Sequence, residues 1–160
     1  MKVNLNMRIR KATKKDFFKL NEMKKEFFLW ECEIDDRLDP NYINNGLGSR
    51  LSRNLNQSNV AFFVAEEKEN FLGFVGVDIS KLPGSFKAKK QGHLFNLYVR
   101  KKYRNNRIST QLIRAAMEWL DKKGINDQII KVHFSDNKAH KIYRKKGFKN
   151  YLIELQRKDN

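Results

Sequence analysis

Basic and amide side chains lie between an apolar strand and an apolar helix in the region 97–112. The turn at its centre carries Arg104, Asn105, Asn106 and Arg107. A helix N-terminus offers unpaired N–H groups and partial positive charge, and arginine side chains add full charges. Asparagine tolerates the left-handed backbone that a tight turn requires. The pattern predicts a strand–turn–helix that binds phosphate groups, and a solvated basic loop before an ordinary helix remains the alternative.

A single polar side chain interrupts the apolar strand just before this turn. Asn96 stands among apolar and aromatic residues over 94–99. If the strand lies in the middle of a sheet, the amide of Asn96 is buried and requires hydrogen-bond partners. It could orient an amine or a water molecule, but an amide cannot act as a base. Bonding to a strand bulge or to neighbouring backbone is the alternative.

Hydrophobic periodicity predicts the elements that position these residues. Strands are expected over 7–11, 60–66, 71–79, 91–100, 128–134 and 148–156, and helices over 14–30, 41–56, 138–146 and from 108 to a stop at Gly124. Three consecutive strands form an antiparallel meander, and the late strand–helix–strand unit requires a parallel pair with a crossover. The expected fold class is therefore α/β, with a mixed central sheet covered by helices on both faces.

Length and composition indicate one domain over 1–160. Of the 160 residues, 40% are hydrophobic, so a packed core can form despite a net charge of +16. The one cysteine excludes an intramolecular disulfide framework and fits a reducing compartment. No apolar run approaches the length of a membrane span, and the N-terminus lacks the apolar core of a cleaved signal. We therefore expect a cytoplasmic protein that does not enter a membrane.

Several common site motifs do not occur in the sequence. Gly46-Leu47-Gly48 lacks the third glycine of a dinucleotide fingerprint, and there is neither a P-loop nor a nucleophile elbow. The histidines and Cys32 are too scattered for metal-ligand spacing, so no metal site is expected. The basic charge would attract nucleic acid, anionic lipid or a phosphate-rich cofactor. Nucleic acid is disfavoured because no helix-turn-helix, RNP or zinc pattern accompanies the charge.

Two segments resemble the GNAT-type N-acetyltransferases, in which a strand leads into R/Q-x-x-G-x-G/A and then a helix. Arg104 matches the first position of that motif, Arg107 replaces its first glycine, and Ser109 replaces its small second one. Downstream, 132–148 is similar to the family segment N-x-x-A-x-x-x-Y-x-x-x-G-F, with Tyr143 in register. Both segments are correctly spaced within the expected order of elements.

The resemblance implies acetyl-coenzyme A as the cosubstrate. The residues implied in binding it, through the strand backbone, the turn and two helix starts, are Leu97, Val99, Arg104, Asn105, Asn106, Arg107, Ser109, Thr110, Asn137 and Tyr143. In the family the tyrosine lies beside the coenzyme sulfur and can protonate the leaving thiolate, a role that falls to Tyr143. Arg107 carries a Cβ where the phosphate approaches, so it either obstructs binding or turns outward and strengthens it.

An acidic loop is the candidate acceptor side. Five acids fall within 31–39, between the first two expected helices: Glu31, Glu33, Asp35, Asp36 and Asp39. In the GNAT fold this loop borders the acceptor site, so a cationic amine would suit it, and Glu31 or Glu33 could act as a base through water. A solvated loop that ends in a helix cap at Asp39 is the alternative.

The sequence therefore predicts an N-acetyltransferase that moves an acetyl group from acetyl-coenzyme A directly to a primary amine in a ternary complex. Tyr143, Asn96 and Glu31 are the expected catalytic residues. A non-catalytic coenzyme binder with a decayed turn and a basic nucleic-acid-binding protein remain as alternatives. No motif specifies the acceptor, which could be a small molecule or a peptide amine. Dimers are common among members of this family, which is compatible with a homodimer.

Overall fold

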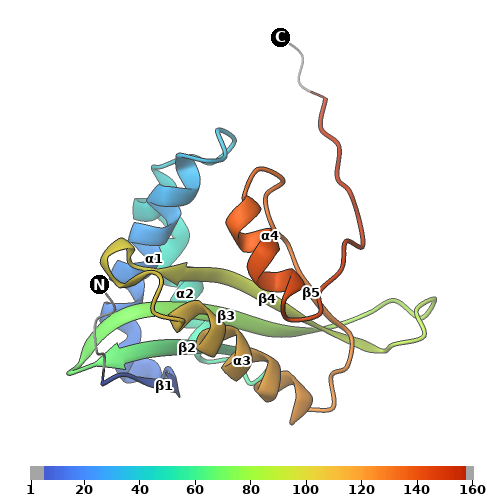
Figure 1. The fold of residues 1–160 in the computed structure, drawn as a ribbon, viewed down its shortest axis with the longest axis horizontal. Coiled ribbons are helices and arrows are strands. Elements are labelled where there is room, and N and C mark those ends of the chain that lie inside the picture. Colours follow the sequence, from blue (N-terminus) through green and yellow to red (C-terminus); the bar gives the residue numbers. More distant parts are fainter. Residues whose placement is uncertain (1–5, 158–160) are drawn as a thin grey trace. The chain divides into compact units, whose positions relative to one another are not determined.

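A mixed sheet organises the first part of the chain in the computed structural model, which describes residues 6–157. These residues divide into two compact units, with the boundary after Ile130. The sheet belongs to the first unit and has the strand order β1-β2-β3-β4-β5 (Figure 1). Its strands are β1 (Arg8–Lys11), β2 (Val60–Glu67), β3 (Asn70–Lys81), β4 (Lys90–Val99) and β5 (Gln128–Ile130).

The strand directions confirm the predicted α/β fold class. Strands β1 to β4 pair antiparallel in succession, and β4 pairs parallel with β5. A parallel pair requires a crossover, which α3 (Ile108–Asp121) supplies. α1 (Phe17–Cys32) and α2 (Gly48–Leu55) lie on one face of the sheet and α3 on the other (Figure 1).

Alternation along β2 divides the core between the two faces. Val60, Phe62 and Val64 pack in one cluster with Leu20 and Met23 of α1. The intervening residues of β2 are buried as well, because α3 covers the opposite face with the apolar stripe Ile108, Leu112, Ala116 and Leu120. A strand covered on both faces is apolar throughout. This is why the run over 60–66 is readily recognised in the sequence.

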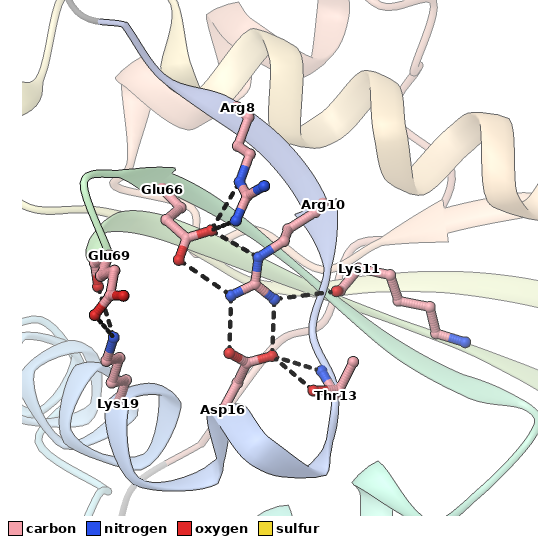
Figure 2. A network of polar contacts seen from close by, with 8 residues as sticks. All are labelled: Arg8, Arg10, Lys11, Thr13, Asp16, Lys19, Glu66 and Glu69. Atoms are coloured by element: carbon pink, nitrogen blue, oxygen red, sulfur yellow. Dashed lines mark hydrogen bonds and ion pairs between the residues drawn. The ribbon is translucent and has the colours of Figure 1, made fainter.

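A network of ion pairs joins β1 to β2 and to the start of α1 (Figure 2). Arg10 donates two hydrogen bonds of 2.8 Å to the carboxylate of Asp16, and its Nε donates to Glu66 Oε2 at 2.7 Å. Asp16 also accepts a hydrogen bond of 2.7 Å from the backbone N–H of Thr13. The Arg10 guanidinium lowers the pKa of Asp16 to about 2, so the network stays ionised at neutral pH.

The second helix is shorter than the expected 41–56. A π-helical turn over Ile43–Leu47 precedes α2, which starts only at Gly48. Glycine lowers helix propensity, and the chain has it at both Gly46 and Gly48. An added Cβ at Gly46 would overlap the ring of Tyr42, so the glycine allows this side chain to pack against the turn.

The two late strands also differ from expectation. The strand expected over 128–134 is formed only as Gln128–Ile130, and the strand expected over 148–156 does not form within the described residues. A strand requires a neighbouring backbone to satisfy its N–H and C=O groups, which apolar alternation does not reveal. Over 148–156 that partner is missing, and Leu155 is 90% exposed.

The second unit contains α4 (Asn137–Arg144), which ends two residues earlier than the expected 138–146. Asp136 caps the helix, since its Oδ1 accepts a hydrogen bond of 3.0 Å from the N–H of Ala139. Gly147, with φ of +90°, allows the chain to leave the helix. Across both units, residues 6–157 include no helix with the length and apolarity needed to span a membrane.

Candidate functional site

The turn between β4 and α3 has the features of an anion-binding site. Arg107 is the N-cap residue of α3, and its side chain makes no capping hydrogen bond. The N–H groups of Ser109 and Thr110, in the first helical turn, therefore remain available to an acceptor outside the chain. Arg104 and Arg107 are exposed beside them. The residues that the sequence assigned to phosphate binding thus combine backbone donors with positive charge.

The backbone of this turn explains the glycine in the GNAT motif. Asn105 and Arg107 have φ values of +67° and +59°, in the left-handed region that glycine adopts most easily. Arg107 therefore keeps a glycine-like conformation at the position where the motif has its first glycine. Its side chain is exposed, which supports the outward alternative and fits the binding of a diphosphate.

Internal hydrogen bonds hold the turn in shape. Arg104 Nε donates to the carbonyl oxygen of Val99 at 2.9 Å. The side-chain amide of Asn106 donates to the carbonyl oxygens of Tyr103, at 3.1 Å, and Arg104, at 3.2 Å. Both side chains thus stabilise the loop that presents the helix start. The terminal nitrogens of Arg104 have no hydrogen-bond partner in the described part of the chain and can bind a phosphate.

Arg107→Gly separates the two interpretations of this residue. Glycine removes about 1 kcal/mol of left-handed backbone strain from the folded state. It also increases the conformational entropy of the unfolded chain by a similar free energy, so we expect little change in melting temperature. Loss of the exposed charge should weaken acetyl-coenzyme A binding about threefold to fivefold in calorimetric titration. Tighter binding by the variant would show that the arginine obstructs the turn.

A β-bulge lies on β4, before the turn that carries Arg104 and Arg107. The register with β3 passes from Gly76↔Phe95 to Phe74↔Tyr98, so Asn96 and Leu97 both stand opposite one residue of β3. Asn96 has φ of +51°, which is unusual for a strand residue. The bulge redirects the side chain of Asn96 away from the regular alternation of the strand.

The edge of β4 beyond this point is not covered by β5. The parallel ladder joins Gly92–Leu94 of β4 to Gln128–Ile130 and ends there, whereas β4 continues to Val99. Leu97 and Val99, whose backbone was expected to bind the cosubstrate, lie in this stretch. Because β5 is short, the backbone of Leu97 and Val99 has no β5 partner on this side.

A cavity of about 800 Å³ opens beside the bulge, entirely within the first unit. α1 forms one wall with Lys24, Phe27, Phe28 and Glu31, which share a helix face at three- and four-residue spacing. The other walls come from α2 and from β3 and β4, and their polar residues include Arg50, Asn54, Asp78, His93 and Asn96. The cavity is large enough for a small acceptor molecule.

Lys24 links the α1 wall to the bulge. Its Nζ donates a hydrogen bond of 3.0 Å to Asn96 Oδ1, and the residue is only 7% exposed. Burial, with a contribution from the charge of Arg50, lowers the pKa of Lys24 to about 8. The bond fixes the Asn96 amide, whose nitrogen has no acceptor among residues 6–157 and can donate to a ligand in the cavity.

Glu31 brings a carboxylate to the same cavity. Burial raises its pKa to about 7, against the opposing charge of Lys24. A carboxylate that titrates near neutral pH is suited to accept a proton from an amine or a water molecule. Glu33, the other candidate base, is exposed and does not line the cavity.

The remaining acidic residues form the loop itself. Asp35 pairs with Arg37, whose Nε donates to its carboxylate at 2.7 Å. Asp39 Oδ1 accepts the N–H of Asn41 at 2.9 Å, so this side chain organises a local turn. None of these carboxylates lines the cavity. Throughout the described residues, no group of three or more His, Cys, Asp and Glu side chains is placed to hold a metal ion.

Sequence reasoning missed several residues of the cavity. Lys24 contacts Asn96 from 72 residues away, and its only signal was a lysine on an otherwise apolar helix face. Arg50 has the appearance of an ordinary surface arginine in the sequence. Asp78 and His93 are cross-strand partners, with 3.7 Å between Oδ2 and Nδ1, a pairing that depends on strand register.

Tyr143 and Asn137 belong to the second unit. Tyr143 is 5% exposed, and its ring meets that of Phe148 edge-on with centroids 5.8 Å apart. Burial raises the pKa of its phenol, so the hydroxyl keeps its proton at neutral pH, as a proton donor requires. Asn137 is exposed at the first position of α4.

The sheet, the bulge and the turn before α3 together define a known class of protein. The model of the acetyltransferase (GNAT) family matches residues 25–148 of this chain. The match includes the turn, α4 and every cavity residue except Lys24, and the chain belongs to this family. It is accordingly an acetyl-coenzyme A-dependent N-acetyltransferase, which confirms the predicted enzyme class and cosubstrate.

Similar proteins cover nearly the whole chain. Spermidine N(1)-acetyltransferase of Thermoplasma acidophilum is 24% identical over 152 residues, 91% of this chain and 89% of that protein. The structure of AAC(6')-Iy with a CoA-S-monomethyl-acetylneamine bisubstrate analog matches with a TM-score of 0.78 and 18% identity, over 97% of this chain and 99% of that chain. A "predicted acetyltransferase" from Clostridium acetobutylicum with acetyl-CoA gives a TM-score of 0.76 and 22% identity, over 94% and 96% of the two chains. The structural likenesses show the shared fold.

Proposed function

We propose that this chain transfers the acetyl group of acetyl-coenzyme A directly to a primary amine bound in the cavity beside Asn96. The observation that carries the proposal is the course of β4. This strand lines the cavity at Asn96 and then runs through Val99 toward the anion-binding turn at Arg104. One strand thus connects the two binding sites that a ternary complex requires. The printed names of relatives, which include spermidine and aminoglycoside acetyltransferases, support an amine acceptor.

The cosubstrate supplies an activated thioester when it is bound. The residues proposed to hold it are those of the β4 edge, the turn, the start of α3 and the helix α4: Leu97, Val99, Arg104, Asn105, Asn106, Arg107, Ser109, Thr110, Asn137 and Tyr143. Uncapped N–H groups at the start of α3 and exposed arginines in the turn support this set. Backbone N–H groups along the uncovered β4 edge would stabilise the negative charge that develops on the acetyl oxygen.

Three side chains carry the proton chemistry in this proposal. Glu31 accepts the proton that the acceptor nitrogen loses, directly or through a water molecule, since its raised pKa matches neutral pH. Asn96 orients the amine through its side-chain nitrogen while Lys24 holds its oxygen. Tyr143 donates its proton to the leaving thiolate. In this proposal the nitrogen–carbon bond forms and the carbon–sulfur bond breaks. Glu31 takes the proton that the nitrogen loses, and the leaving thiolate takes a proton from Tyr143.

The proposal also concerns the organisation of the chain. The family match crosses from the first unit into the second, which supports one acetyltransferase domain over 1–160. The single cysteine supports a cytoplasmic location. A homodimer is proposed because dimers are common among members of the family. Gel filtration with light scattering tests the homodimer directly.

Steady-state kinetics tests direct transfer. Thiol release is measured with a panel of primary amines, and initial rates are then recorded against both substrates. Direct transfer gives intersecting double-reciprocal lines, whereas parallel lines would reveal an acetyl-enzyme and contradict the ternary complex. Binding of acetyl-coenzyme A without thiol release for any amine would instead support the non-catalytic alternative.

A further inference from the structure

The cavity beside Asn96 has an excess of positive charge. Its walls carry the two carboxylates Glu31 and Asp78 against four fixed cations: Lys24, Arg50, Lys81 and Lys90. Spermidine and the aminoglycosides, which the names of relatives mention, are polycations. Like charges in a partly buried site repel each other. The cavity therefore differs from what a polycationic acceptor requires.

The two carboxylates offset only part of this charge. Asp78 lies beside His93 on the neighbouring strand, with 3.7 Å between Oδ2 and Nδ1, and within the described residues it forms no ion pair with Lys24 or Arg50. Burial raises the pKa of Glu31 to about 7, so this carboxylate is partly protonated at neutral pH. Lys24 Nζ has the neutral amide oxygen of Asn96 as its hydrogen-bond acceptor. The charge of Glu31 acts on Lys24 across the cavity, but no hydrogen bond or ion pair joins these two side chains within residues 6–157.

Arg50 adds a second charge next to Lys24. It lies close enough to contribute to the lowered pKa of Lys24, and it lines the same cavity from α2. In the part of the chain that the structure describes, Arg50 forms no hydrogen bond or ion pair. Arg50 is exposed, and its charge disfavours the charged form of the buried Lys24. An anion bound by both side chains would relieve this cost.

We propose that the acceptor of this enzyme carries an anionic oxygen group, a carboxylate or a phosphate, which Arg50 and Lys24 bind. The planar guanidinium of arginine recognises both groups through paired hydrogen bonds. Lys24 also contacts Asn96, so an anion held there brings the amine of the same molecule near Asn96 and Glu31. This inference rests on the proposed function, because it names the substrate class of that same cavity.

Matched acceptors test the substrate class. Thiol release is measured with β-alanine and its amide, with O-phosphoethanolamine and ethanolamine, and with spermidine, and rates are compared per neutral amine. We expect an anionic member to exceed its matched partner at least about tenfold in kcat/KM, as for one charged hydrogen-bond pair. The pair that shows the difference identifies the anion as carboxylate or phosphate. A higher kcat/KM for spermidine than for every anionic amine would overturn the inference.

Arg50→Gln tests the residue. We expect the KM of the anionic acceptor to rise about tenfold with kcat changed less than threefold, and the KM of the matched neutral amine to stay within about twofold. Arg53→Gln is the matched control, because Arg53 is exposed on the same helix and does not line the cavity. An equal rise in KM for the anionic and neutral acceptors would mean that Arg50 does not recognise the anion.

A binding measurement separates this inference from the proposed function. Inorganic phosphate is titrated into protein saturated with coenzyme A, and the melting temperature is recorded. Phosphate should stabilise the wild type and Arg53→Gln, but not Arg50→Gln. This difference without thiol release from any amine would refute the acetyl transfer and leave the anion site intact. Equal stabilisation of all three proteins would refute the anion site.

Discussion

We expect Glu31→Gln to lower kcat/KM for the amine acceptor about 100-fold above pH 8, and far less at pH 5.5. Burial raises the pKa of Glu31 to about 7, so the wild type should lose the ionised form of this proposed base as the pH falls through 7. A protonated carboxyl group and the amide of glutamine are equally unable to take a proton. The ratio of wild-type to variant activity should therefore climb with pH below 7 and level off above it.

Thiol release between pH 5.5 and 9.5 measures this ratio. The ratio is more informative than either profile, because ionisation of the acceptor amine affects both proteins and cancels. Glu33→Gln is the control, since Glu33 is an exposed carboxylate two residues away that does not line the cavity. A ratio that does not change with pH would assign Glu31 a structural role.

Elements buried on both faces are the ones that the sequence predicted best. The strands expected over 60–66 and 71–79 are formed as Val60–Glu67 and Asn70–Lys81. Their apolar residues are selected by packing against helices, so the signal is continuous and strong. The strand expected over 148–156 failed because a strand needs a partner, and a local pattern contains no information about its partner.

The strand, turn and helix around 104–109 were predictable because they are contiguous in the chain. Residue types alone indicated a strand end, a basic turn and a helix start there, and phosphate binding by this turn stays a prediction. The left-handed backbone at Arg107 was not evident from the residue type, because arginine rarely adopts it; only the glycine that the GNAT motif has at this position suggested it. The structure supplied the conformation that makes the arginine compatible with that position.

The acceptor cavity could not be predicted, because its residues come together only through the fold. The hydrogen bond of Lys24 to Asn96 spans 72 residues and depends on a bulge that shifts the register of β4. Sequence reasoning found Asn96 as a lone amide and Glu31 as part of an acidic loop. The structure separates Glu31 from that loop and places it in the cavity with Lys24, where its own burial raises the pKa of Glu31 and that of Lys24 lowers the pKa of the lysine.

If Tyr143 is the proton donor as proposed, we expect Tyr143→Phe to lower kcat about 100-fold and to leave the dissociation constant of acetyl-coenzyme A within about threefold. The substitution removes only a hydroxyl group, so the edge-on contact with the ring of Phe148 is retained. Burial raises the pKa of the Tyr143 phenol, and the hydroxyl therefore remains protonated throughout the working range of pH. The fractional loss in the variant should thus be the same at pH 6.5 and at pH 8.5.

This independence from pH distinguishes a proton donor from a base. For Glu31→Gln the loss grows as the carboxylate ionises, whereas for Tyr143→Phe the donor is present at every pH tested. Tyr151→Phe is the matched control, because Tyr151 is 80% exposed in the same unit. A variant with normal kcat and a lowered melting temperature would show that the hydroxyl of Tyr143 serves packing alone. A loss that appears only at high pH would show that this tyrosine acts in its ionised form, which its burial opposes.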